Sequence, residues 1–285
     1  MENIQKIQEG MLHAGYICTE ETATVLFLAQ ALNKPILVEG PAGVGKTSVA
    51  QAFARMQGLE LLRLQCYEGI DEARALYEWN YKKQLLHIQA IGNQTLDISE
   101  IEKQIFSKDF LMPRPLLKSI TNENKVCLLI DEIDKVDFEF EAMLLELLSE
   151  YQVTVPEFGT IVAKQIPAVF LTSNASRELS EALKRRCLYI YLDFPSPETE
   201  QHILSLRIPN LSAELSAQLV EALTKIRKLR LKKYPSIAES IDWGMALLAM
   251  GKTSVDQQFI METLNVLLKY QDDMNKAKAI FSNAG

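Results

Sequence analysis

Short apolar runs alternate with helix-like periods along most of the chain. Five brief runs have the pattern of strands buried in a parallel sheet: residues 36–38, 59–64, 126–130, 168–171 and 188–192. Apolar residues recur at helical spacing in four stretches: residues 20–32, 47–58, 67–86 and 138–148. Strands that alternate with helices predict an α/β fold in three layers, with a parallel sheet in the middle.

Two further segments depart from that alternation. Residues 152–163 alternate apolar and polar side chains on both sides of a Pro-Glu-Phe-Gly turn, which predicts a β-hairpin. Residues 90–121 show neither period clearly, so the sequence leaves their structure open.

The pattern changes after the Pro-Ser-Pro stretch at residues 195–197. Beyond it, apolar residues recur at helical spacing, with no strand pattern, in three stretches: residues 212–231, 237–250 and 254–270. We therefore expect an α/β nucleotide-binding core with an N-terminal helical segment over 1–195. A smaller, all-helical lid domain should follow over 196–285.

Composition and charge narrow the class of protein. Apolar residues make up 48% of the 285 residues and charged residues only 24%, which excludes a largely disordered chain. The formal net charge is −7. Proteins that bind nucleic acid by neutralising phosphates usually carry a basic excess, so this balance argues against a nucleic-acid partner.

The placement of cysteines and the start of the chain bear on location. The four cysteines have no CxxC spacing, so neither a zinc site nor a disulfide framework is predicted. Free thiols fit a reducing compartment. The first ten residues lack a basic and then apolar export signal, and no apolar run approaches the length of a membrane span. We expect a cytoplasmic protein with no membrane partner.

The most specific motif lies between the first apolar run and the next helix. Residues 40–47 read GPAGVGKT, a glycine-rich loop whose backbone N–H groups can surround phosphates at a helix N-terminus. Lys46 is expected to reach the β- and γ-phosphates and Thr47 to hold Mg²⁺. The sequence thus predicts ATP and Mg²⁺ as ligands. The expected nucleotide-binding residues are Gly40, Pro41, Ala42, Gly43, Val44, Gly45, Lys46, Thr47 and Ser48.

Asp131 and Glu132 end the apolar run at 126–130. The carboxyl ends of strands in α/β sheets face the region where ligands bind, so these acids are poorly explained as solvated loop residues. We expect Asp131 to hold the metal through water and Glu132 to orient and deprotonate the attacking water.

Three later residues have two interpretations each. Asn174 follows the run at 168–171 and can contact the γ-phosphate or the water, although an asparagine there is also typical of a cap or turn. Arg185 and Arg186 precede the last apolar run. An arginine so far along the chain is suited to a neighbouring subunit's phosphate, as an arginine finger. The residues alone favour a solvated basic helix end.

Taken in order, the phrases GPAGVGKT, LLIDEIDK, FLTSN and ALKRRC followed by a helical tail resemble the AAA+ ATPases. Within them the chain is similar to the MoxR branch and its CoxD-like members. The phrases that point there are QCYEGIDEARALYEWNYKKQLL, RPLL, QVTVPEFGTIVA and PSIAESIDW. The resemblance spans residues 15–248.

This resemblance implies a ring, a hexamer, with ATP at the subunit interfaces. Lys46 and Thr47 match the Walker A pair and Asp131 and Glu132 the Walker B pair. Asn174 matches the first sensor, and Arg186, preceded by Arg185, matches the finger. MoxR proteins typically act as chaperone-like remodellers beside a partner with a von Willebrand factor A domain. CoxD-like members are associated with the maturation of metal-containing enzymes.

The chain departs from the family at one place. Many MoxR proteins carry an arginine, the second sensor, shortly after the serine of the lid motif. Here the matching position after Ser236 is Ala238, Glu239 follows, and the nearest basic residues are Lys232 and Lys233. The departure implies that the γ-phosphate is sensed mainly from the neighbouring subunit.

The expected activity is hydrolysis of ATP to ADP and phosphate, coupled to the remodelling of a protein partner. One alternative is a nucleic-acid-associated AAA+ ATPase, such as a helicase loader or McrB-like translocase. The basic run at 225–233 would serve it, although such a run is more often a solvated helix face. A second alternative is a slow, nucleotide-gated scaffold, which the presence of Glu132 argues against.

Overall fold

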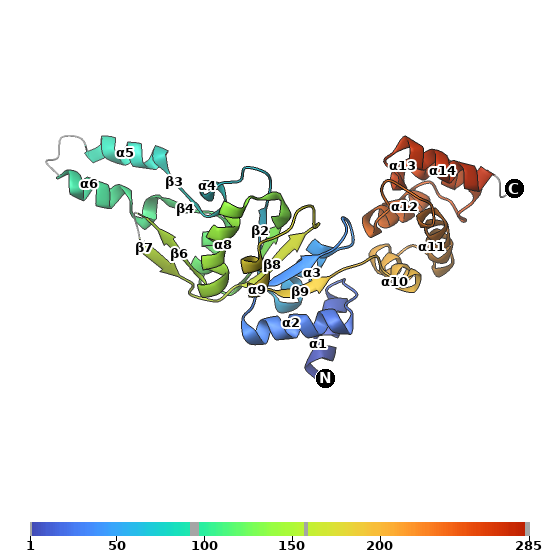
Figure 1. The fold of residues 1–285 in the computed structure, drawn as a ribbon, viewed down its shortest axis with the longest axis horizontal. Helices are drawn as coiled ribbons and strands as arrows, with labels where there is room; N and C mark the ends of the chain where they lie inside the picture. Colours follow the sequence, from blue (N-terminus) through green and yellow to red (C-terminus); the bar gives the residue numbers. More distant parts are fainter. Residues whose placement is uncertain (1, 92–96, 157–158, 283–285) are drawn as a thin grey trace.

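A computed structural model describes residues 2–91, 97–156 and 159–282 of the chain. Figure 1 shows a central sheet with helices around it and, to one side, a separate group of helices formed by the C-terminal part. At the opposite side, two helices project away from the sheet. Among the described residues, no helix is both long and apolar enough to cross a membrane.

The central sheet has five parallel strands. In spatial order they are β2 (Glu60–Gln65), β5 (Val126–Asp131), β8 (Ala168–Ser173), β1 (Ile36–Glu39) and β9 (Leu188–Tyr191). The register places Glu39 beside Ser173 and Gln65 beside Asp131, so the carboxyl ends of the strands share one edge. All six residues of β5 are buried, as expected for the middle of a parallel sheet. The predicted α/β fold is confirmed.

Alternation along each strand supplies a core on each face of the sheet. Cys127 and Leu129 face one side, where they pack against three helices: α1 (Glu2–His13), α2 (Glu20–Leu32) and α3 (Lys46–Gln57). Leu128 and Ile130 face the other side. The helices there are α4 (Glu72–Ala75), α7 (Pro115–Thr121), α8 (Phe138–Glu150) and α9 (Glu181–Arg186). Short 3₁₀ turns lie at Lys108–Phe110 and Ile133–Lys135.

An insertion between β2 and β5 contains the projecting helices. It includes the strands β3 (Tyr77–Trp79) and β4 (Leu111–Pro113), which pair antiparallel. Beyond them lie α5 (Tyr81–Ile91) and α6 (Ile98–Ile105), whereas residues 92–96 lie outside the described part. The prediction of a continuous helix over 67–86 was wrong, because the aromatic Tyr-Glu-Trp segment pairs with a strand more than thirty residues later.

The predicted hairpin at 152–163 is present as β6 (Gln152–Val155) and β7 (Gly159–Val162), which pair antiparallel. Residues 157–158 of its turn lie outside the described part. Much of the stretch left open at 90–121 is accounted for by α6, β4 and α7.

The C-terminal part has its own core. Its helices are α10 (Pro197–Arg207), α11 (Ala213–Arg227), α12 (Ile237–Ala249), α13 (Gln257–Leu267) and α14 (Gln271–Ser282). Ser196, Ser212 and Asp256 cap the starts of α10, α11 and α13 through side-chain oxygens. The largest buried side chain is Trp243, which stacks on Phe259 and donates its indole N–H to Thr263 Oγ1 at 2.7 Å.

Replacing this tryptophan tests the helical core. Trp243→Ala should lower the free energy of unfolding of the helical region by about 3–5 kcal/mol, because it leaves a large cavity. Urea unfolding followed by circular dichroism measures the change. Met245, on the same helix and 49% exposed, gives the matched control: Met245→Ala should change the value by less than about 0.5 kcal/mol. Equal effects of the two variants would contradict this account of the core.

Candidate functional site

The carboxyl edge of the sheet opens into a cavity of about 680 Å³. The glycine loop and the ends of β5 and β8 line one side of it. The linker after β9, one face of α10 along its length and the start of α12 line the other. The cavity therefore lies between the α/β core and the helical part.

Lys46 lies at the centre of this edge. It is the first residue of α3 and 7% exposed. Its ammonium donates to the carbonyl oxygens of Gly40 at 2.7 Å and Pro41 at 2.8 Å, and to Asn174 Oδ1 at 2.8 Å. Burial lowers the pKa of Lys46, and nearby carboxylates, Asp134 first, partly oppose that shift. Lysine and asparagine, predicted from separate motifs, thus lie in direct contact.

Two glycines of the loop make close approaches that a side chain would prevent. Gly40 has φ +152°, and a Cβ there would lie 2.1 Å from the carbonyl oxygen of Leu192. Gly43 has φ +79°, and a Cβ there would lie 2.2 Å from Ser236 Oγ. The two Cβ–oxygen distances, 2.1 Å and 2.2 Å, are far below ordinary contact distances. The first glycine is required for the loop to pass β9, and the second for the loop to meet the start of α12.

The Asp131 carboxylate accepts hydrogen bonds from two neighbouring strands, β2 and β8, and from the glycine loop motif. The Thr47 hydroxyl donates to Asp131 Oδ1 at 3.2 Å, and the Thr172 hydroxyl donates to the same oxygen. Arg63 forms an ion pair with Asp131 Oδ2. Asp131 is 4% exposed, so its charge is stabilised by these partners rather than by bulk water. Thr47 and Asp131, both predicted metal ligands, lie within hydrogen-bond distance.

Glu132 is held in a different way. Its backbone has φ +58°, an uncommon conformation outside glycine, and its N–H donates to Thr172 Oγ1 at 2.9 Å. Its carboxylate accepts a hydrogen bond from Gln65 Nε2 at 3.2 Å. The turn carries the carboxylate out of the strand direction, and it lines the cavity with Asp131.

Asp134 lies immediately behind these acids. It is buried, and its Oδ2 accepts hydrogen bonds from the Ser176 N–H at 3.0 Å and hydroxyl at 2.6 Å. Burial alone would raise the pKa of Asp134, but the hydrogen bonds with Ser176 outweigh it, so the pKa lies below its ordinary value. This anion adds to the negative field around Lys46.

Arg185 and Arg186 lie away from the cavity. Arg186 ends α9 and donates to the Ser149 hydroxyl and to the Ala182 carbonyl at 2.8 Å. The following strand runs parallel to β1 for four residues, so roughly 13 Å of strand separates this end of the sheet from the glycine loop. Arg185 is exposed. The structure does not bring either arginine to the glycine loop of its own chain.

The basic residues near Ala238 are engaged elsewhere. Ala238 itself lines the cavity. Lys233 forms an ion pair with Glu239 at 3.4 Å, and Lys232 pairs with Asp272 at 2.9 Å. In the same basic run, Lys225 pairs with Glu221 and Arg227 with Glu200. Most of the run at 225–233 is therefore neutralised by acidic neighbours, which argues against a phosphate-binding face there.

Three contributors to the site were missed by the sequence interpretation. Thr172, Gln65 and Arg63 contact Asp131 or Glu132 from the strands on either side of β5. Gln65 and Arg63 alternate with the buried Leu62 and Leu64 of β2. That alternation marks a polar face, but only the strand order shows what the face contacts.

Thr172 provides a test of this arrangement. Thr172→Val keeps the shape of the side chain but leaves the Glu132 N–H without its partner and removes one of the two hydroxyls that donate to Asp131 Oδ1. We expect the free energy of unfolding to fall by about 1–3 kcal/mol, the usual result of burying unpaired polar groups. Thr154→Val, in the exposed hairpin strand β6, is the matched control and should have little effect. Urea titrations that give equal values for both variants would contradict the arrangement.

The comparisons with known proteins agree on the fold. Two variants of Thermotoga maritima RuvB have a similar structure, with TM-scores of 0.53 and 0.51 at 13% and 14% identity; the matches cover 95% and 94% of this chain and 72% and 69% of theirs. A tRNA dimethylallyltransferase of Fusobacterium nucleatum is 26% identical over 53% of this chain, which spans 57% of that enzyme's length. An uncharacterized protein of Staphylococcus epidermidis is 25% identical over 73% of this chain and 71% of its own.

The family assignment rests on the nucleotide-binding part. Residues 35–187 match the profile of the family described as AAA domain, dynein-related subfamily. The matched range begins just before β1 and ends just after α9, so it contains the glycine loop, both acids and Asn174. With more than half of its length in this match, the chain belongs to the dynein-related subfamily of AAA domain proteins.

Proposed function

We propose that the protein hydrolyses ATP at the cavity beside the glycine loop. One observation carries this proposal: Lys46, Thr47, Asp131 and Glu132 converge at a single sheet edge that opens into a cavity of about 680 Å³. The AAA family and the RuvB-like fold imply an ATPase of this general type.

Each group has a role that follows from its place. The Lys46 ammonium would exchange the loop carbonyl oxygens for β- and γ-phosphate oxygens, with Asn174 retained as a neighbour of the γ-phosphate. Glu132 would accept the proton of the attacking water, since its carboxylate faces the cavity and Gln65 fixes its direction. Residues 42–48 would direct their backbone N–H groups at the phosphates, while Pro41, which has no N–H, would contribute only to the shape of the loop.

The donor set fits Mg²⁺. A hydroxyl and a carboxylate oxygen, Thr47 Oγ1 and Asp131 Oδ1, lie 3.2 Å apart at the phosphate side of the cavity, and Mg²⁺ prefers such oxygen ligands. When bound, Mg²⁺ would neutralise charge on the phosphates. Thr172 and Arg63 hold the Asp131 carboxylate in the orientation this requires.

A ring of subunits would complete the site. Arg186 lies at the end of the sheet opposite its own glycine loop, which leaves a neighbouring subunit's γ-phosphate as its target. Ion pairs with the phosphoryl group in the transition state are the usual contribution of such a finger. We infer a homo-oligomer, a hexamer by resemblance, in which Arg186 acts between subunits and Arg185 is the exposed residue beside it.

We further infer a MoxR-type role, in which residues 196–285 form the lid of a machine that remodels a protein partner. The projecting insertion supports a protein partner. Its helix α5 exposes four large apolar side chains, each more than 40% accessible, the kind of surface that proteins rather than nucleic acids bind: Tyr81, Leu85, Leu86 and Ile88. A von Willebrand factor A domain protein is the partner that the resemblance suggests.

The general-base role of Glu132 can be tested directly. Glu132→Gln should retain ATP affinity within about threefold and lose at least about 100-fold in kcat, because an amide cannot accept the water's proton. Lys46→Ala is the comparison, since losing the ammonium should abolish ATP binding itself. Binding of a fluorescent ATP analogue and steady-state phosphate release separate the two effects. Hydrolysis near the parent rate in Glu132→Gln would exclude it as the base.

The role of Arg186 between subunits gives a second test. Arg186→Ala should bind ATP normally and lose about 100-fold or more in kcat, a loss confined to the transition state. Arg185→Ala is the matched control and should lose much less. Arg186→Ala subunits retain Glu132, and Glu132→Gln subunits retain Arg186. Mixing the two should restore part of the ATPase activity, at the interfaces where Glu132 of one subunit faces Arg186 of the other. Mixed rings as inactive as either variant alone would rule out action between subunits.

A further inference from the structure

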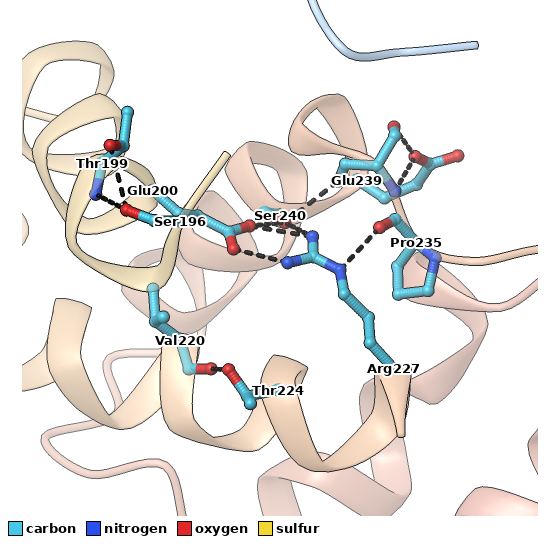
Figure 2. Close-up of polar contacts among 10 residues, drawn as sticks. Ser196, Thr199, Glu200, Val220, Thr224, Arg227, Pro235, Glu239 and Ser240 are labelled. Carbon is cyan, nitrogen blue, oxygen red and sulfur yellow. Dashed lines mark hydrogen bonds and ion pairs between the residues drawn. The ribbon is translucent and has the colours of Figure 1, made fainter. Parts of the chain in front are cut away.

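One arginine in the helical part joins three of its elements (Figure 2). Arg227, the last residue of α11, pairs with Glu200 of α10 through both terminal nitrogens, at 2.5 Å and 2.9 Å. The side chains are 17% and 1% exposed, respectively. This is a bidentate ion pair, and because both side chains are largely buried it is rigid and little screened by water.

The same pair holds the chain on both sides of Ser236. Arg227 Nε donates to the carbonyl of Pro235 at 3.0 Å, and Nη2 donates to Ser240 Oγ at 3.2 Å. The Ser240 hydroxyl lies 2.6 Å from Glu200 Oε1 and 3.0 Å from the carbonyl oxygen of Ser236. The carbonyl groups of Pro235 and Ser236 are therefore both fixed by one network, in which Figure 2 shows Arg227 between Glu200, Ser240 and Pro235.

Ser236 is also the point at which the lid meets the glycine loop. A Cβ at Gly43 would lie 2.2 Å from Ser236 Oγ and 2.5 Å from Ser236 Cβ, so the backbone of the glycine loop lies directly against the Ser236 side chain. Glu239 Oε2 accepts the Ser236 N–H at 2.9 Å and fixes the start of α12. Any displacement of the loop at Gly43 is therefore transmitted to Ser236.

The ion pair is buried behind residues that line the cavity. Glu200 lies on the first turn of α10, next to Thr199, which lines the cavity. The guanidinium carbon of Arg227 is 5.6 Å from the ring centroid of Phe194, another lining residue in the linker. The Arg227–Glu200 pair thus braces two walls of the cavity, the start of α10 and the start of α12.

We propose that Arg227 and Glu200 are positioning residues that make the lid respond to nucleotide at the glycine loop. The inference rests on the proposed ATPase function. At Ala238 the lid presents a methyl group to the cavity, so a charged contact from that position cannot report the γ-phosphate. The response passes instead through the contact of the Gly43 backbone with the Ser236 side chain. A contact of this kind transmits movement only when the segment that carries Ser236 is rigid.

The experiment compares two arginines three residues apart. Arg227→Met removes the charge and its hydrogen bonds but keeps much of the side-chain volume, and Arg230→Met, at an exposed position, is the matched control. We expect Arg227→Met to weaken binding of a fluorescent ATP analogue by roughly tenfold, a usual size for coupling between sites. Hydrogen exchange of the amides of residues 236–240 should no longer slow when ATP is added. Arg230→Met should match the parent.

Glu200→Gln keeps the proposal testable if Arg227→Met fails to fold, because the amide preserves shape and most hydrogen bonds. It should weaken ATP binding in the same direction and reduce the slowing of exchange. Thermal unfolding is measured in parallel. Variants that melt earlier but keep the parent ATP affinity and the ATP-dependent slowing would reduce the pair to a structural role and overturn the proposal.

Two further outcomes are informative. Arg207 also lines the cavity. If Arg207→Ala lowers the affinity for the ATP analogue tenfold and Arg227→Met does not lower it, the lid responds through a direct contact of Arg207 with the nucleotide, and the proposal for Arg227 and Glu200 is overturned. A parent protein that fails to bind ATP would instead overturn the proposed function, before any variant is compared.

Discussion

The buried ammonium of Lys46 is the interaction on which the site depends. It ties two carbonyl groups of the glycine loop to Asn174 at the end of β8, so the loop and the sheet edge are fixed relative to each other. A buried cation is stable only with such acceptors and with anions nearby, and Asp134 and Asp131 supply that field. The positions of the acids and of the glycine loop are therefore set together.

The two acids of β5 are supported by the strands beside it. Thr172 on one side joins the Asp131 carboxylate to the Glu132 backbone, while Arg63 and Gln65 on the other side contact both carboxylates. Because parallel strands end in register, polar residues at the ends of β2 and β8 meet those of β5 without any further adjustment. The sheet order thus decides which residues can orient the carboxylates of Asp131 and Glu132.

The sequence was sufficient for features encoded locally. The glycine loop, the acids after 126–130 and Asn174 each follow a short apolar run, and a parallel sheet brings such run ends together. Tyr77–Trp79 was assigned to a helix although it forms a strand. The spacing of its apolar residues does not show that Leu111–Pro113 pairs with it. The Arg227–Glu200 pair and the contact of Gly43 with Ser236 were unreadable for the same reason, since they join residues far apart in the chain.

The insertion that carries α5 and α6 leaves the core between β2, which ends at Gln65, and β5, which Glu132 follows directly. The hydrogen bond between those two side chains therefore lies at the root of a long, narrow arm (Figure 1). Among the described elements, the β3–β4 ribbon packs against α4 and α7, and α7 packs against β2 and β5 of the core. A small rotation at that base moves the far ends of α5 and α6 through an arc that grows with their distance from it. Movement of the projecting helices is therefore linked, through the end of β2, to Gln65, the hydrogen-bond partner of the Glu132 carboxylate.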